Sequence, residues 1–248
     1  MPTVMLVGSI VIQALLIVHV IKTGRNQIWI WVLALLSFPG VIAYVAVELI
    51  PDVLKSRSTR SAVKGVKQAL DPEADLRRYQ NEARLTGNVS SNQKYAEELM
   101  RQDKPREAAE IYRTVLKGLY EHDPNLMLGL ATAQFKAGSF AEARATLDQL
   151  IATNPEFKSP QGHLLYARAL EGEGATERAL SEYRVLAGYF SGAEAAVRYA
   201  QLLRSQGQGE EAGRVLRDLL EQASVAPPHY RRTQKDWLDR AQREVSTL

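Results

Sequence analysis

Residues 166–183 read YARALEGEGATERALSEY and contain the pattern that decides the fold. Two alanines, Ala167 and Ala179, lie twelve residues apart, and Gly174 stands between them. Tyr183 follows the second alanine by four residues, which is about one turn of an α-helix. Glycine readily takes the left-handed backbone conformation that ends a helix. The stretch therefore predicts two antiparallel helices joined at Gly174, with the small alanines where the two backbones cross closely.

The same pattern occurs four times after about residue 90. The first alanines belong to the dipeptides Tyr95-Ala96, Leu130-Ala131, Tyr166-Ala167 and Tyr199-Ala200. The helix stops are Asp103, Gly138, Gly174 and Gly207. The second alanines are Ala108, Ala143, Ala179 and Ala212, at separations of 35, 36 and 33 residues. This period and its internal spacing resemble the tetratricopeptide repeat (TPR) family, in which each repeat is a pair of antiparallel helices.

The resemblance implies an all-α fold with a TPR-type α-solenoid of about four helix pairs. The expected repeats cover residues 89–123, 124–159, 160–192 and 193–226. Pro124 comes four residues later than the family's closing proline would, so we expect the second helix of the first repeat to be a turn longer. Residues 227–248 predict one C-terminal helix that caps the open end of the solenoid. A free helix that docks on another protein is the alternative.

The first 50 residues have a different composition from the rest. Between Val4 and Ile50, the charged residues are Lys22, Arg25 and Glu48. The apolar runs 4–21 and 28–50 contain 18 and 23 residues, and ~1.5 Å per residue makes both comparable with a hydrocarbon core of ~30 Å. With the connector 22–27 they predict a two-helix transmembrane hairpin. A cleaved signal peptide is the alternative for the first run, but no basic residue precedes it.

Three further expectations concern this hairpin. Pro39-Gly40 should kink the second span, since proline removes a backbone donor inside a helix. His19 and Glu48 should lie near opposite ends of the hairpin and should not meet. The short first span, Trp29, the Phe38-Pro39-Gly40 motif and Tyr44 resemble the N-terminal membrane domain of the cardiolipin synthase and phospholipase D-type family. That family's catalytic HxK motifs are missing, because no histidine is followed two residues later by lysine.

A basic juxtamembrane strip and a linker helix occupy residues 51–88. Residues 51–67 carry a net charge of +4, and the candidate contacts to anionic lipid are Lys55, Arg57, Arg60, Lys64 and Lys67. Basic residues favour the cytoplasmic side of a membrane, which would place residues 51–248 inside and the connector outside. Asp71-Pro72-Glu73 predicts a helix start, and Gly87 predicts its end.

Composition also limits the possible chemistry. The chain has no cysteine, which excludes disulfides and thiol catalysis. The basic strip accounts for the net charge of +3, so nucleic-acid binding is not expected. No phosphate-binding loop, metal-ligand spacing or nucleophile–base pair is present, so we expect no enzyme activity, cofactor or metal.

The TPR resemblance implies that the first helix of each repeat lines a groove that binds proteins or peptides. The groove positions are Gln93, Glu97, Thr132, Arg168, Arg198, Gln201 and Arg204. The three arginines favour an acidic ligand, and a solvated charged face is the alternative. Gln93 and Glu97 stand where chaperone-binding TPR domains carry their Lys/Asn carboxylate clamp, so that clamp is not matched.

These features together predict a membrane-anchored scaffold or adaptor on the cytoplasmic face of a bacterial-type inner membrane. The alternative is a periplasm-facing envelope-assembly or chaperone-like factor with the inverted topology.

Overall fold

The computed structural model describes residues 2–23, 26, 28–35, 37–49 and 71–247. The chain divides into two compact units, residues 1–74 and 75–248, and each is described by itself. The basic strip 51–67 lies outside the described residues. The same holds for the candidate lipid contacts Lys55, Arg57, Arg60, Lys64 and Lys67.

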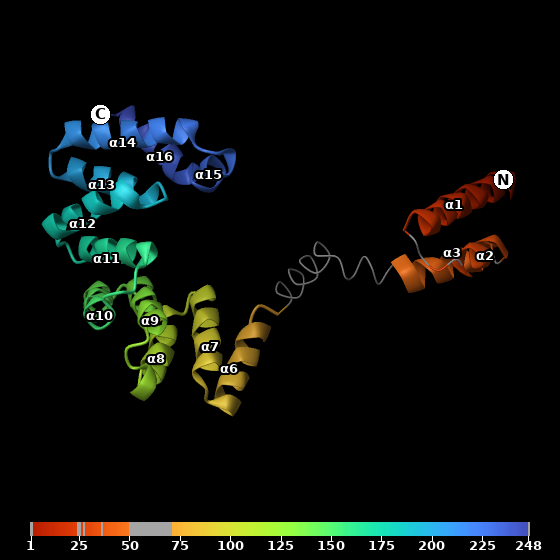
Figure 1. Ribbon diagram of the computed structural model, residues 1–248, viewed down its shortest axis with the longest axis horizontal. Coiled ribbons are helices and arrows are strands. Elements are labelled where there is room, and N and C mark those ends of the chain that lie inside the picture. Colours follow the sequence, from red (N-terminus) through yellow and green to blue (C-terminus); the bar gives the residue numbers. More distant parts are fainter. Residues whose placement is uncertain (1, 24–25, 27, 36, 50–70, 248) are drawn as a thin grey trace. The chain divides into compact units, whose positions relative to one another are not determined.

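The N-terminal unit consists of α1 (Pro2–Thr23), α2 (Ile28–Leu35), α3 (Ser37–Tyr44) and the π-helix η1 (Val45–Leu49). Helix α2 packs beside α3, and both contact α1 (Figure 1). Val20, Leu33 and Tyr44 form the buried core. Within the described parts of the chain, no helix combines the length and the apolarity needed to span a bilayer. The two predicted spans are therefore not confirmed.

The second apolar segment folds back on itself and does not form one kinked helix. Helix α2 ends at Leu35 and α3 begins at Ser37, so Pro39 lies in the first turn of α3. Proline is tolerated there because the first N–H groups of a helix have no acceptor within it. The side chain of Trp29, at the start of α2, donates its Nε1–H to Glu48 Oε1 over 2.9 Å. The prediction of a kink at Pro39-Gly40 is therefore wrong.

The fold-back also brings together groups that we expected to be far apart. The ring of Trp29 meets the ring of Tyr44 edge-on, with centroids 5.3 Å apart. The Tyr44 hydroxyl lies 2.9 Å from His19 Nδ1. His19 and Glu48 thus belong to one chain of contacts through Tyr44 and Trp29, and the prediction that they lie at opposite ends is wrong.

The C-terminal unit is a row of helix pairs, and between residues 89 and 225 each α-helix packs against the next (Figure 1). A leading helix α6 (Ala74–Thr86) adds Leu76 and Ala83 to the buried residues. The four pairs are α7 (Val89–Arg101) with α8 (Pro105–Val115), α9 (Pro124–Lys136) with α10 (Phe140–Thr153), α11 (Pro160–Gly172) with α12 (Thr176–Tyr189), and α13 (Glu194–Ser205) with α14 (Gly209–Val225). The described residues of this unit contain helices and no strand. The prediction of a TPR-like α-solenoid is confirmed.

The turns inside the four pairs share one backbone geometry. Gly138, Gly174 and Gly207 have φ of 82°, 77° and 77°, and Asp103 takes φ of 55° in the first pair. In each pair the next N–H donates back to a carbonyl five residues earlier, as in Ala175 N to Leu170 O at 2.9 Å. This hydrogen bond closes the first helix of the pair. It explains why glycine recurs at three of the four stops.

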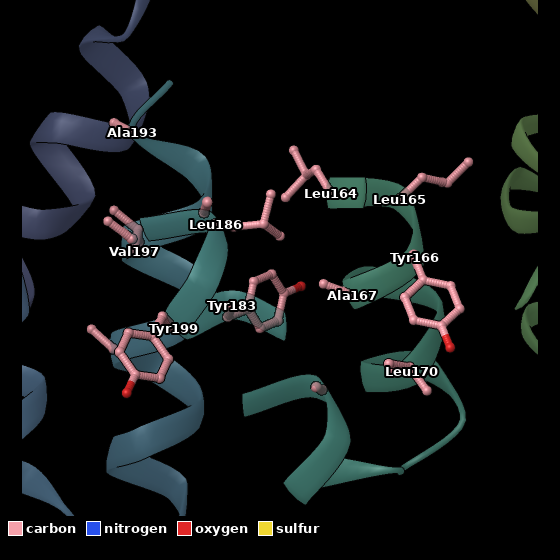
Figure 2. Close-up of a cluster of buried hydrophobic side chains, with 14 of the residues drawn as sticks. Leu164, Leu165, Tyr166, Ala167, Leu170, Tyr183, Leu186, Ala193, Val197 and Tyr199 are labelled. Carbon is pink, nitrogen blue, oxygen red and sulfur yellow. The ribbon is translucent and has the colours of Figure 1, made fainter. Parts of the chain in front are cut away.

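The repeated alanines lie at the crossings of the helices. Their exposed fractions are zero to 1%, and they are Ala96, Ala108, Ala131, Ala143, Ala167, Ala179, Ala200 and Ala212. The large residue four positions after each second alanine is also buried, and Tyr183 is the extreme case at 0%. Figure 2 shows its ring pointing toward Ala167 on the neighbouring helix. A larger side chain at Ala167 would occupy the space that this ring fills.

Two local predictions were wrong. Helix α8 ends at Val115, and the short 3₁₀-helix η2 (Gly118–Tyr120) precedes α9, so the second helix of the first repeat is not longer.

The C-terminal segment, for which one helix was predicted, forms two helices, α15 (Pro228–Thr233) and α16 (Lys235–Val245). The Gln234 side chain between them accepts a hydrogen bond from the Ala193 N–H over 3.0 Å. This bond ties the joint between the two helices to the start of α13.

Candidate functional site

The predicted groove positions of the first two repeats are engaged in local hydrogen bonds. Gln93 Nε2 donates to Glu97 Oε1, one turn away on α7, over 2.9 Å. The Thr132 hydroxyl donates to the Leu128 carbonyl over 2.7 Å. These three residues lie on α7 and α9 as expected, but their polar groups are partly satisfied within their own helices.

Two of the groove arginines are paired with carboxylates of the same unit. Arg198 Nε donates to Glu194 Oε1 over 2.8 Å, and Arg198 Nη1 lies 3.4 Å from Glu171 Oε2. Arg168 Nη1 is 3.5 Å from the same Glu194 oxygen, and its guanidinium lies over the Phe135 ring at 4.6 Å from the centroid. Two cations face two anions here, so these arginines add no net positive charge. The geometry gives no support to an acidic ligand.

The groove positions of the last repeat contact the C-terminal helix. The Gln201 amide donates to Glu244, and Arg204 Nη1 lies 3.5 Å from the Thr247 hydroxyl. Ala241 of α16 is fully buried, and Trp237 packs against the core while Arg198 lies over its ring. Helix α16 therefore packs on α13 and α14 as a cap, and not as a free docking helix.

A second surface, which the sequence did not predict, forms a cavity of about 590 Å³ between α10, α11, α12 and the loop 154–159. Its walls are mainly apolar, and the apolar residues are Leu147, Leu150, Ile151, Phe157, Pro160 and Gly162. Ile151 and Tyr189, at its edge, are 60% and 51% exposed. We call this cavity the lateral pocket. It fits the usual description of a binding site, which is concave and mostly apolar with few polar groups.

A histidine held on both sides forms one edge of the lateral pocket. His163 Nδ1 lies 2.6 Å from the Tyr189 hydroxyl, and His163 Nε2 lies 2.7 Å from Glu182 Oε2. Burial and the nearby Glu182 raise the pKa of Tyr189, so its hydroxyl stays protonated at neutral pH. Both ring nitrogens of His163 therefore have a hydrogen-bond partner within the repeat unit.

Asp148, a second polar residue that lines the pocket, is an acid held by two donors. Asp148 Oδ1 accepts a hydrogen bond from the Tyr166 hydroxyl over 2.8 Å, and Asp148 Oδ2 lies 2.5 Å from Arg144 Nη1. Arg178 in turn donates to the Tyr166 oxygen over 2.9 Å. Burial, followed by the bond to Asp148, raises the pKa of Tyr166. These bonds fix the polar rim, so the shape of the pocket is preformed.

Sequence reasoning missed this pocket because it assigned binding to the first helices of the repeats alone. The lateral pocket uses the second helices α10 and α12 and the loop that ends at Ser159, whose hydroxyl caps α11. One available signal was Ile151, an apolar residue on a helix face that the repeat pattern leaves exposed. Among the described residues, no group of acidic or histidine side chains has the arrangement of a metal site.

Fold and pocket together define the class: an α-solenoid of stacked helix pairs with an apolar cavity between α10, α11 and α12. Residues 99–169 match the tetratricopeptide repeat family. Three solved structures of this fold are similar to the chain. A crystal structure of MamA has a TM-score of 0.55 at 17% identity and covers 68% of this chain and 95% of its own. MamA 41-end from Desulfovibrio magneticus RS-1 has a TM-score of 0.57 at 15% identity, with the same two coverages of 68% and 95%.

The third is a putative kinesin light chain from Podospora anserina with nearly identical TPR-like repeats. It has a TM-score of 0.51 at 19% identity and covers 64% of this chain and 87% of its own. A search of curated proteins found no significant match. The family match does not include residues 1–50, so the resemblance of that segment to cardiolipin synthase and phospholipase D-type proteins stays a prediction.

Proposed function

We propose that this protein is a non-catalytic scaffold or adaptor whose repeat unit binds a partner protein through the lateral pocket. The observation that carries the proposal is the preformed pocket of about 590 Å³ on α10, α11 and α12. Its volume lies within the range of roughly 300–1,000 Å³ that is typical of ligand sites. It has room for a large apolar side chain of a partner.

A protein partner fits the pocket better than a small polar metabolite. The polar groups of the rim are largely used in bonds to one another, which leaves few donors and acceptors to orient a small ligand. Exposed Ile151 and Tyr189 stand at the mouth, where a partner's side chains would cover them. Interfaces draw most of their binding energy from such apolar and aromatic contacts around a central pocket. Recognition through an apolar anchor is therefore favoured over recognition through charge.

The absence of catalysis is also part of the proposal. The one histidine in the lateral pocket has both nitrogens engaged, and the two tyrosines beside it have raised pKa values. Neither tyrosine would act as a nucleophile or base near neutral pH. The role left for the site is binding.

We further propose that the N-terminal unit holds the protein at a bacterial-type inner membrane, with the repeat unit in the cytoplasm. The apolar composition of residues 4–50 supports the membrane location. The five basic residues within 51–67 support the cytoplasmic side. A reporter fused after Leu248 tests the side: activity only outside the cytoplasm would establish the periplasm-facing alternative.

A matched pair of surface substitutions tests binding at the pocket. Ile151→Asp places a charge at the mouth of the lateral pocket, whereas Val185→Asp alters a residue of similar exposure on α12 that does not line it. Neither change removes a buried contact, so both variants should fold. Full-length protein would be purified from membranes in mild detergent, and co-purified proteins would be quantified by mass spectrometry.

We expect a partner that is lost from Ile151→Asp and retained by Val185→Asp. Arg204→Glu, on the predicted groove, should retain it as well. Identical partner sets for Ile151→Asp and the unmodified chain would rule out the pocket. Loss only in Arg204→Glu would return the binding site to the groove.

A further inference from the structure

The N-terminal unit places the beginning and the end of its second apolar segment side by side. Trp29, near the start of α2, bonds to Glu48, near the end of η1, over 2.9 Å. The ring contact of Trp29 with Tyr44 lies one turn further back along the same segment. A segment that crossed a bilayer would have these ends about 30 Å apart. The contacts therefore require that both ends lie at the same depth.

The length of the first arm, α2, agrees with this geometry. Helix α2 has 8 residues, and α3 with η1 continues from Ser37 to Leu49. At ~1.5 Å per residue, α2 is ~12 Å long, which is less than the ~15 Å that one leaflet contributes to the hydrocarbon core. The tip between the arms carries Leu35, which is 77% exposed, the largest exposed fraction among the exposed large apolar residues of this unit. An apolar tip is what a hairpin needs if the turn between its helices lies deepest in the hydrocarbon of the leaflet.

The polar and apolar side chains of the unit are arranged as a lipid surface requires. The polar groups of the unit form two partly buried pairs, Trp29 Nε1 with Glu48 and His19 with the Tyr44 hydroxyl. Large apolar side chains are exposed on α1, α2 and η1, and they are Leu15, Val18, Ile21, Ile28, Trp31, Leu35 and Val47. Exposed apolar surface of this extent marks an interaction site. Lipid is the partner that demands satisfied polar groups inside and apolar groups outside.

The charges of the sequence identify the lipid and the side. In a two-span hairpin, Lys22 and Arg25 of the connector would be separated by the membrane from the five basic residues of 51–67. If the second segment returns to its starting face, all seven lie on one side, in agreement with the preference of Lys and Arg for the cytoplasmic face. They would then meet anionic headgroups, which attract such residues.

We propose that residues 28–49 form a re-entrant hairpin, which enters and leaves an anionic leaflet on the same side and does not cross the bilayer. The inference rests on the membrane location proposed above and makes one further claim. The connector 22–27 lies on the same side as the repeat unit, whereas a two-span hairpin places it on the opposite side.

The absence of native cysteine makes this claim directly measurable. Thr23→Cys places one thiol at the exposed end of α1, and Ser224→Cys places one on the exposed surface of the repeat unit. Each full-length variant would be expressed in cells, and right-side-out and inverted membrane vesicles would be treated with a membrane-impermeant maleimide. Labelling after detergent solubilisation gives the total reactive thiol in each sample.

We expect both cysteines to be labelled from the same face, with equal ratios of labelling between the two kinds of vesicle. Labelling from opposite faces would overturn the re-entrant hairpin while leaving the membrane location intact. A Thr23→Cys thiol that reacts from neither face would also overturn it, because the connector would then be inside the membrane. Recovery of the protein outside the membrane fraction would overturn the proposed location itself.

Discussion

Gly129, in the middle of α9, gives a sharp test of how the first two repeats pack. A Cβ at this position would lie 2.6 Å from Cζ and 2.7 Å from Cε1 of the Tyr112 ring on α8. Tyr112 is only 4% exposed, so its ring has little room to move away. Gly129→Ala should gain about 1 kcal/mol from helix propensity. It should lose about 1–3 kcal/mol from overpacking, so we expect a net loss of up to about 2 kcal/mol in the free energy of unfolding.

The matched control is Gly188→Ala, in the last turn of α12, where a Cβ would meet no atom within 4 Å. This variant should be as stable as the unmodified chain or more stable by up to about 1 kcal/mol. The assay is urea unfolding of the full chain in detergent, followed by far-ultraviolet circular dichroism. Hydrogen exchange should place the loss in Gly129→Ala on peptides of α8 and α9, because repeats couple mainly to their neighbours.

A double variant separates the clash from other effects of the alanine. With Tyr112→Leu as background the ring is gone, and adding Gly129→Ala should then be neutral or stabilising. The reasoning would be refuted if Gly129→Ala in the unmodified chain stabilised as much as Gly188→Ala. It would also be refuted if the loss persisted in the Tyr112→Leu background.

Three other predictions concern the same unit. Burial, and to a smaller extent Glu97, raises the pKa of Tyr112 to about 12 from its usual 10.0. As the pH rises, the unfolded chain therefore loses this proton before the folded chain does. The free energy of unfolding should fall by about 1.4 kcal/mol per pH unit between pH 10 and pH 12, and Tyr112 should not affect it at lower pH. Urea midpoints measured against pH check this, because Tyr112→Phe should lack the contribution of Tyr112 to the decrease. Ala167→Trp forces an indole into the space beside Tyr183 and should unfold the third repeat; an unchanged melting curve would contradict the repeat assignment. Trp237→Ala removes the half-buried ring that anchors α16 and should cost about 2 kcal/mol, with faster hydrogen exchange in α13 and α16. Exchange that is unchanged in α13 would show that α16 is not its cap.

The solenoid could be predicted from the sequence because its determinants are local and repeated. Ala167, Gly174 and Ala179 each report one contact or one backbone angle, and the register of four copies removes the ambiguity of a single one. The same property explains the error at the first repeat. Pro124 shifts the start of α9, but nothing in the local pattern says whether α8 lengthens or a 3₁₀ turn fills the gap.

The fold-back of the N-terminal unit could not be predicted in the same way. Hydropathy counts apolar residues, and 28–50 is equally apolar whether it runs straight or turns at its middle. What distinguishes the two is the pairing of Trp29 with Glu48, which lie 19 positions apart. Similarly, Arg168 looks like a free cation in the sequence because its partner Glu194 belongs to the following repeat. Contacts between residues that do not recur from repeat to repeat produce no periodic pattern in the sequence, so they could not be predicted from it.

The paired charges on the groove have a consequence for how that surface responds to salt. An acidic ligand that replaced Glu194 or Glu171 beside Arg168 or Arg198 would exchange one ion pair for another. The Coulomb energy of the exchange is close to balanced, and added ions screen the broken and the newly formed pairs alike. Association at this face should therefore have a nearly flat ionic-strength dependence. Its selectivity would come from the fit of surfaces and not from long-range attraction.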